Sequence, residues 1–131
     1  MYNDVEKFLD KMNIERQQSP DFCSDEVMKM RHKHLIEESN EFVQSNNMSD
    51  LEGCVDALVD VVYVALGTAA MMGLTKEHWD LCWKEVHAAN MRKVAGEVKD
   101  HKVGVVKPEG WVGPDFSKIL PYDNEYPIGE D

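Results

Sequence analysis

Residues 55–73, VDALVDVVYVALGTAAMMG, form the most apolar run of the chain. Apolar residues occupy nearly every side of a helix drawn through this run, so we expect a helix from about residue 51 to Gly73 that is buried on several sides. Asp56 and Asp60 interrupt the run one helical turn apart. Because an ionised carboxylate is costly to bury alone, the pair indicates a compensating charge, and a divalent cation is the simplest candidate.

The segments on either side of this run are also predicted to be helical. Apolar residues recur at helical spacing before and after it, and Ser and Thr stand where helices would begin. The expected helices are residues 2–13, residues 24–46 with Ser24 or Asp25 as cap, residues 51–73, and a fourth that Thr75 caps and that frays near residues 95–96. Short connections favour antiparallel neighbours, so we predict an all-α antiparallel bundle of about four helices.

The C-terminal part of the chain is predicted to be irregular. Residues 97–131 are rich in Gly and Pro, which end helices, but they also carry Trp111 and Phe116. We therefore expect a helical bundle at residues 1–96 and an irregular tail that packs on it. The helix at residues 51–73 is too apolar for one small bundle, which favours a homo-oligomer, either a dimer or a tetramer.

Composition restricts the partners of the protein. The net charge of −11 over 131 residues argues against nucleic acid and anionic membranes as partners, because such binding relies on clustered Lys and Arg. A small phosphate-bearing substrate would need a metal ion between the two negative partners. We see no uninterrupted membrane-spanning stretch and no apolar signal-peptide core, and the three cysteines form no CxxC pair. These features predict a cytoplasmic protein with reduced thiols.

Acidic residues on two helices define a candidate metal site. Glu38 and Glu41 are three residues apart and Asp56 and Asp60 are four apart, so each pair can reach one point beside its helix. If the two helices pack antiparallel, the four carboxylates converge, and oxygen ligands of this kind suit Mg²⁺ or Mn²⁺. The alternative is a solvated acidic face. It suits Glu37 and Glu41 better than the two aspartates, which Val, Leu and Ala flank.

These residues match a family signature, EExxE followed on the next helix by ExxD. Glu37, Glu38 and Glu41 fit the first half, and Asp60 fits the final Asp. The chain thus resembles the all-α nucleoside triphosphate pyrophosphohydrolases, which include MazG-like enzymes, dimeric dUTPases and phosphoribosyl-ATP pyrophosphohydrolases. The Glu of ExxD falls on Ala57, which cannot bind metal. Asp56, one residue earlier on the same broad face, is the candidate replacement.

A second resemblance is to the phosphoribosyl-ATP-pyrophosphohydrolase-like branch, and it covers residues 25–116. It rests on the segments DVVYVALGTAAMMGL, EVHAANMRK and KPEGWVGPDF. It implies that Asn90 and Lys93, an Asn-x-x-Lys element, lie near the substrate, although a Lys near a helix end needs no such role. Lys107, in the Gly- and Pro-rich tail, is a further candidate to meet the nucleotide. The alternative is a tail that only covers the bundle.

The resemblance implies a Mg²⁺-dependent enzyme that converts a nucleoside triphosphate, or a related nucleotide, to the monophosphate and pyrophosphate. Metal-bound carboxylates are poor bases, so Glu37, beside the ligands, is the candidate general base. Two alternatives stay open: a phosphoribosyl-ATP pyrophosphohydrolase, and a non-enzymatic helical module with a degenerate metal site, which Ala57 would explain. The basic cluster at residues 31–34 is expected to pair with acidic neighbours at the surface rather than with phosphate.

Overall fold

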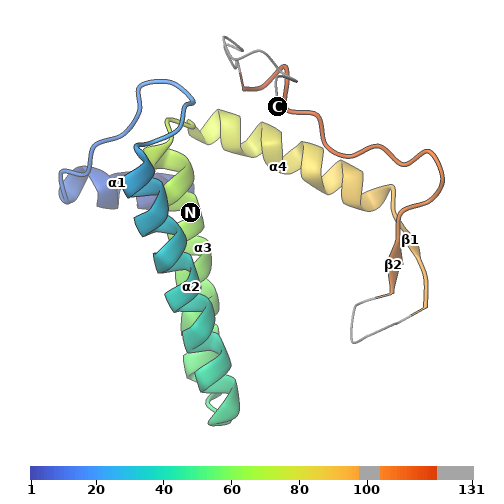
Figure 1. Cartoon of the computed structure of the whole chain (residues 1–131), viewed down its shortest axis with the longest axis horizontal. Coiled ribbons are helices and arrows are strands. Elements are labelled where there is room, and N and C mark those ends of the chain that lie inside the picture. The colour runs from blue at the N-terminus through green and yellow to red at the C-terminus, as the bar shows by residue number, and fades with distance from the viewer. Residues whose placement is uncertain (98–103, 121–131) are drawn as a thin grey trace. The chain divides into compact units, whose positions relative to one another are not determined.

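The computed structural model describes residues 1–97 and 104–120. This part of the chain is all-α apart from one small two-stranded sheet (Figure 1). The helices are α1 (Tyr2–Lys11), α2 (Asp25–Asn47), α3 (Leu51–Met71) and α4 (Lys76–Met91), and the antiparallel strands are β1 (Val94–Ala95) and β2 (Val105–Val106). The chain forms two compact units, Met1–Lys76 and Glu77–Asp131, each considered by itself below. The division into a bundle and a tail at residue 96 stays a prediction, and tail residues 98–103 and 121–131 lie outside the described residues.

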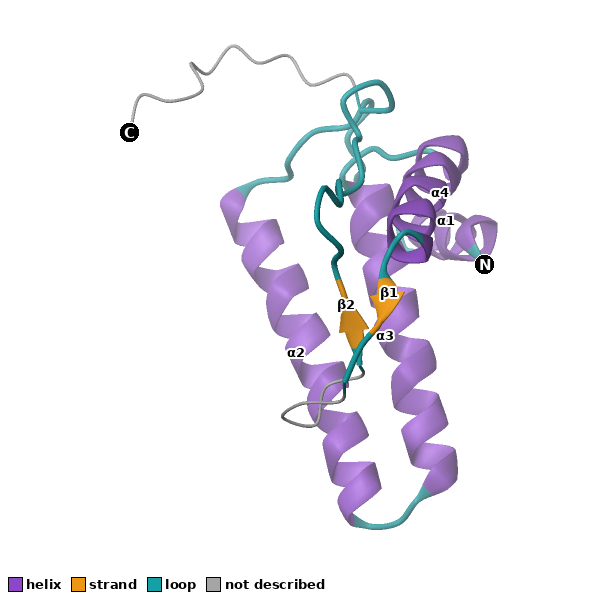
Figure 2. Ribbon diagram, turned by 90° about the vertical axis from the view of Figure 1, so that its right-hand side faces the viewer, coloured by secondary structure: helices purple, strands orange, loops and turns teal. Residues whose placement is uncertain are grey.

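A tight turn joins α2 to α3 and places them side by side and antiparallel (Figure 2). Ser24 caps α2 by accepting the Val27 amide at 3.3 Å, and Asp50 caps α3 by accepting the Gly53 amide at 3.0 Å. The turn is crowded, since a Cβ at Gly53 would lie 2.5 Å from the Asp50 carboxylate. Two capped helices of 23 and 21 residues thereby face each other along their length.

α1 packs against the second half of α3 and closes the core of the first unit. Val5 and Leu9 of α1 are each 2% exposed, and the Phe8 and Tyr63 rings meet edge to face at 5.7 Å. The Tyr2 hydroxyl donates to the Leu74 carbonyl at 2.5 Å. The buried residues of α3 are Ala57 and, in its second half, Val64, Leu66, Gly67, Ala69, Ala70 and Met71.

The first half of α3 is much more exposed than its composition suggests. Leu58 and Val59 are 51% and 57% exposed, and they border an apolar groove of about 410 Å³ between α1 and α3. The expectation that this helix is buried on several sides therefore holds only for its second half within one chain.

By length and composition alone, α3 could cross a membrane, since its most apolar 18 residues have a mean hydropathy of 1.7. Asp56 and Asp60 still interrupt this apolar stretch. The central helix of a soluble bundle passes the same two criteria, so they do not decide between the two settings.

The fourth helix ends four residues before the expected position. α4 stops at Met91, where the Arg92 amide reaches the carbonyls of both Ala88 and Ala89 at 3.2 Å. Val94 and Ala95 then pair with Val106 and Val105. The prediction of helix up to residues 95–96 was wrong because a partner strand, distant in sequence, satisfies the backbone there.

Candidate functional site

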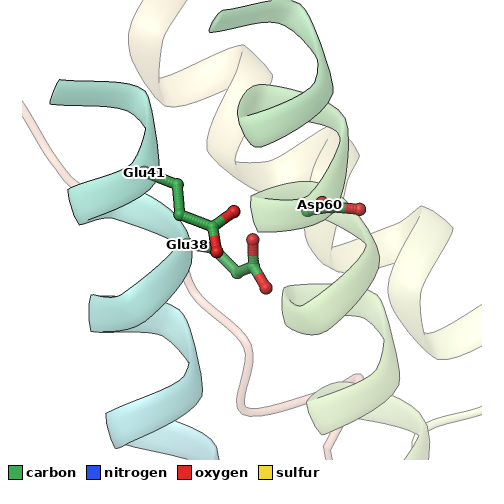
Figure 3. A group of neighbouring side chains, drawn as sticks. All are labelled: Glu38, Glu41 and Asp60. Atoms are coloured by element: carbon green, nitrogen blue, oxygen red, sulfur yellow. The ribbon is translucent and has the colours of Figure 1, made fainter. Parts of the chain in front are cut away.

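Three carboxylates from α2 and α3 form a compact group in the first unit. Glu38, Glu41 and Asp60 each offer one oxygen, and these oxygens lie within 4.8 Å of one another. Figure 3 shows the Glu38 and Glu41 side chains extending from α2 towards α3. The antiparallel hairpin thus brings together three of the four residues that the sequence suggested as ligands.

Glu38 is the member of this group with a buried carboxylate oxygen. Its side chain is 14% exposed, and its Oε2 atom is buried with no hydrogen-bond partner among the described residues. Burial raises the pKa of Glu38, and the neighbouring carboxylates of Glu41 and Asp60 raise it further. His34, whose Nε2 lies 3.3 Å from Oε1, opposes this shift only in part.

This donor set fits a hard divalent cation. Unpartnered buried carboxylate oxygens are costly, and several oxygens converging on one point are the ligands that Mg²⁺ and Mn²⁺ prefer. No described residue donates a hydrogen bond to the buried Glu38 oxygen, which is the observation that points to an ion here.

Two further acidic candidates lie outside the compact group. Asp56, one turn before Asp60, is exposed, and Glu37 is exposed on α2 beside Glu38. Ala57, where the signature has Glu, is 1% exposed. The roles of Asp56 as ligand and of Glu37 as base stay predictions.

Arg31 does not pair with an acidic neighbour as the sequence suggested. Its Nε donates to Thr68 Oγ1 at 3.0 Å, and one terminal nitrogen donates to the Val64 carbonyl at 3.0 Å. Gly67 makes room, because a Cβ there would lie 2.9 Å from the guanidinium. Burial lowers the pKa of Arg31. This residue ties α2 to α3. Among the described residues, His34 is the one member of the basic cluster that pairs with an acid, Glu38.

In the second unit, the two lysines predicted to bind substrate both lie close to one aromatic ring. The ammonium groups of Lys93 and Lys107 lie 5.3 and 4.9 Å from the centre of the Trp111 ring. Asn90 is exposed in the last turn of α4, and its carbonyl accepts the Lys93 amide at 3.1 Å. Substrate binding by these three residues stays a prediction.

Trp111 was treated in the sequence as a packing residue. A signal was available, since Lys107 precedes it by four residues across a Pro-Glu-Gly segment that favours a turn. The structure has that turn: the Trp111 amide donates to the Pro108 carbonyl at 3.0 Å, and Gly110 has a φ of 76°.

Comparison with known proteins agrees with the signature. No curated protein matches the chain in sequence. The model of the phosphoribosyl-ATP pyrophosphohydrolase family matches residues 5–90, which is more than half of the chain. The matched region contains all the acidic candidates and Asn90. The chain therefore belongs to the phosphoribosyl-ATP pyrophosphohydrolase family, within the MazG-like nucleotide pyrophosphohydrolase superfamily.

Proposed function

We propose that the protein is a Mg²⁺-dependent nucleotide pyrophosphohydrolase that cleaves the bond between the α and β phosphates of a nucleoside or deoxynucleoside triphosphate. Family membership supports pyrophosphohydrolase activity on a nucleotide. The observation that carries the metal requirement is the group of Glu38, Glu41 and Asp60 around an unpartnered buried oxygen.

Glu38, Glu41 and Asp60 would hold the ion, with the exposed Asp56 as a weaker fourth contributor. When bound, Mg²⁺, or Mn²⁺ in its place, supplies charge that polarises the phosphoanhydride and lowers the pKa of a water molecule. Glu37 lies beside the ligands on α2 but outside their group, so its lone pairs are free to accept a proton.

The reaction assigned to these residues is a hydrolysis. The water oxygen forms a bond to phosphorus as the bridging P–O bond breaks, and Glu37 takes the proton that the water loses. Lys93 and Lys107 offset the charge of the phosphates, and Asn90 donates a hydrogen bond to the nucleotide. The products are the nucleoside monophosphate and pyrophosphate.

Phosphoribosyl-ATP is the second candidate substrate, and the family match itself favours it. A panel of the eight common nucleoside and deoxynucleoside triphosphates and phosphoribosyl-ATP, each with Mg²⁺, separates the two by the initial rate of pyrophosphate release. Glu41→Gln should abolish release from the preferred substrate. Glu26→Gln, the same change at an exposed position of α2, should not. A protein that releases no pyrophosphate from any of them would support a non-enzymatic helical module.

We also propose that the protein is a homo-oligomer that works in the cytoplasm. The exposed apolar residues of α3 and the groove beside them support burial against another copy. All three cysteines are free, as expected in a reducing compartment. Light scattering at micromolar concentration should give at least a dimer, and a stable monomer would contradict the assembly.

A further inference from the structure

Two positive charges in the second unit share one aromatic ring. Lys93 follows α4 and Lys107 follows β2, yet both ammonium groups lie close to 5 Å from the Trp111 ring centre, at 5.3 and 4.9 Å. The electron-rich face of an indole attracts a cation, and this attraction offsets part of the repulsion between the two lysines. Both ammonium groups therefore lie against the same ring.

The ring is itself anchored by the backbone of α4. The indole Nε1 donates to the Ala89 carbonyl at 2.8 Å, and the turn from Pro108 fixes the Trp111 backbone. The Arg92 guanidinium donates to the Val112 carbonyl at 3.0 Å, which adds a second tie between the end of α4 and this segment. These contacts fix the ring against which both ammonium groups lie.

These charges have no carboxylate partner in the described part of the second unit. In the first unit Arg16 pairs with both Glu6 and Asp10, whereas neither Lys93 nor Lys107 forms an ion pair with an acid among the described residues. Glu109, two residues after Lys107, is exposed and makes no ion pair with it. In a chain with a net charge of −11, two ammonium groups beside one ring, with no acidic partner in the described part of the chain, favour an anionic ligand.

We infer that Lys93, Lys107 and Trp111 form an oligophosphate-binding site that distinguishes linked phosphates from a single phosphate, with Trp111 as its positioning residue. Each ammonium group has three donors and can meet a different phosphate of a P–O–P unit. Orthophosphate offers one phosphate group, so it cannot satisfy both lysines in the same way. Assigning the bound unit to the substrate tail or the released pyrophosphate rests on the proposed function, but the binding site does not.

Calorimetric titration of the full chain with sodium pyrophosphate, in EDTA to remove divalent ions, tests the site directly. Wild type should bind pyrophosphate at least about tenfold more tightly than orthophosphate, a ratio equal to about 1.4 kcal/mol. Lys93→Ala and Lys107→Ala should each weaken pyrophosphate binding by about tenfold or more, because each removes one charge-assisted contact. Lys84→Ala, the same change at an exposed position of α4, is the matched control and should bind as wild type does.

The role of the ring is tested by two substitutions. Trp111→Phe keeps an aromatic face and should retain more pyrophosphate affinity than Trp111→Leu, which removes it. Equal binding of the two phosphates, or lysine variants that bind like Lys84→Ala, would overturn the inference. Because both lysine positions are outside the core, circular dichroism of their variants should match wild type, so a lost affinity reports on binding.

Failure of this inference differs from failure of the proposed function. Glu41→Gln, which removes a predicted metal ligand, should still bind pyrophosphate in EDTA. A wild-type protein that releases pyrophosphate with Mg²⁺ but does not bind it in EDTA would contradict the lysine site alone. A protein that binds it in EDTA but releases none from any nucleotide would contradict the proposed function alone.

Discussion

The guanidinium of Arg31 donates a hydrogen bond to the backbone carbonyl of Val64 at 3.0 Å, across the interface between α2 and α3. The same carbonyl accepts the Thr68 hydroxyl at 2.8 Å, and Thr68 Oγ1 in turn accepts Arg31 Nε. Arg31 lies two turns before Glu38 on α2. The contact therefore helps to fix which residues of α2 face Asp60.

Arg31→Ala should destabilise the protein by about 2 kcal/mol, because hydrogen bonds from a charged donor contribute on the order of 1.5–3 kcal/mol and the half-buried contact is not replaced. Urea unfolding measures the change. Lys33→Ala, an equal loss of charge at an exposed position of α2, is the control and should fall within about 0.5 kcal/mol of wild type. Equal effects of the two substitutions would show that Arg31 does not tie the helices together.

The Tyr2 phenol should make the stability of the protein depend on pH in alkaline solution. Burial raises its pKa from 10.0 to about 12, with the Glu6 charge as a second cause. The folded state therefore keeps the phenol protonated where the unfolded chain would ionise. Stability from this group is fully present below pH 10 and is lost as the pH rises towards 12.

Tyr2→Phe tests this by removing both the titrating group and its hydrogen bond to the Leu74 carbonyl. The variant should be less stable than wild type by about 1 kcal/mol at neutral pH. From about pH 10 towards pH 12 this difference in stability should narrow, because only wild type carries the ionisable phenol. Thermal unfolding of both proteins at a series of pH values measures this difference. A difference that stays constant across the pH range would contradict a raised pKa for Tyr2.

Much of the fold could be predicted because it depends on local patterns. Ser24 and Asp50 stand before apolar runs and do cap α2 and α3, and three of the four acidic residues expected to converge from the facing helices do so. The end of α4 could not be predicted, because it depends on pairing between Val94 and Val106 across a gap in sequence. The helix and strand propensities of the residues near Met91 carry no information about a strand partner elsewhere in the sequence.

The same limit applies to the site residues. The spacing of Glu38 and Glu41 places both on one face of α2, but it does not reveal that one Glu38 oxygen is buried and the other faces His34. Arg31 was expected to find an acid because the chain has many, whereas it reaches the α3 backbone where Gly67 leaves room. A turn and a hydrogen bond from its indole to the Ala89 carbonyl place Trp111 beside the two lysines, and the sequence pattern does not show that hydrogen bond.

Substitutions at Asp56 and Asp60 rank the two aspartates as ligands. Asp60→Asn should weaken Mg²⁺ binding far more than Asp56→Asn, because only Asp60 lies in the compact group and Asp56 is exposed. The loss for Asp56→Asn should be less than about fivefold, as is typical of a solvent-screened charge. Titration calorimetry with Mg²⁺ gives both values, and equal losses would make Asp56 a full fourth ligand.

The general base is separated from the ligands by comparing binding with turnover. Glu37→Gln should bind Mg²⁺ as wild type does but lose activity by roughly 100-fold or more, because a positioned base contributes that much. Glu41→Gln should lose both. Initial rates of pyrophosphate release measured beside Mg²⁺ titrations make the comparison. A Glu37→Gln variant with a near wild-type rate would place water activation elsewhere.

The most direct measurement is calorimetric titration of the metal-free protein with Mg²⁺, for wild type, Asp60→Asn and Glu26→Gln. The account predicts saturable binding to wild type and to the exposed control Glu26→Gln, and loss of that binding in Asp60→Asn, because Glu38, Glu41 and Asp60 surround one point. Mg²⁺ should also raise the melting temperature of wild type, since an ion that binds only the folded state stabilises it by about 2.7 kcal/mol at a hundred times its Kd. Binding that is equal in all three proteins, or absent from wild type, would contradict the metal site and the proposed function that depends on it.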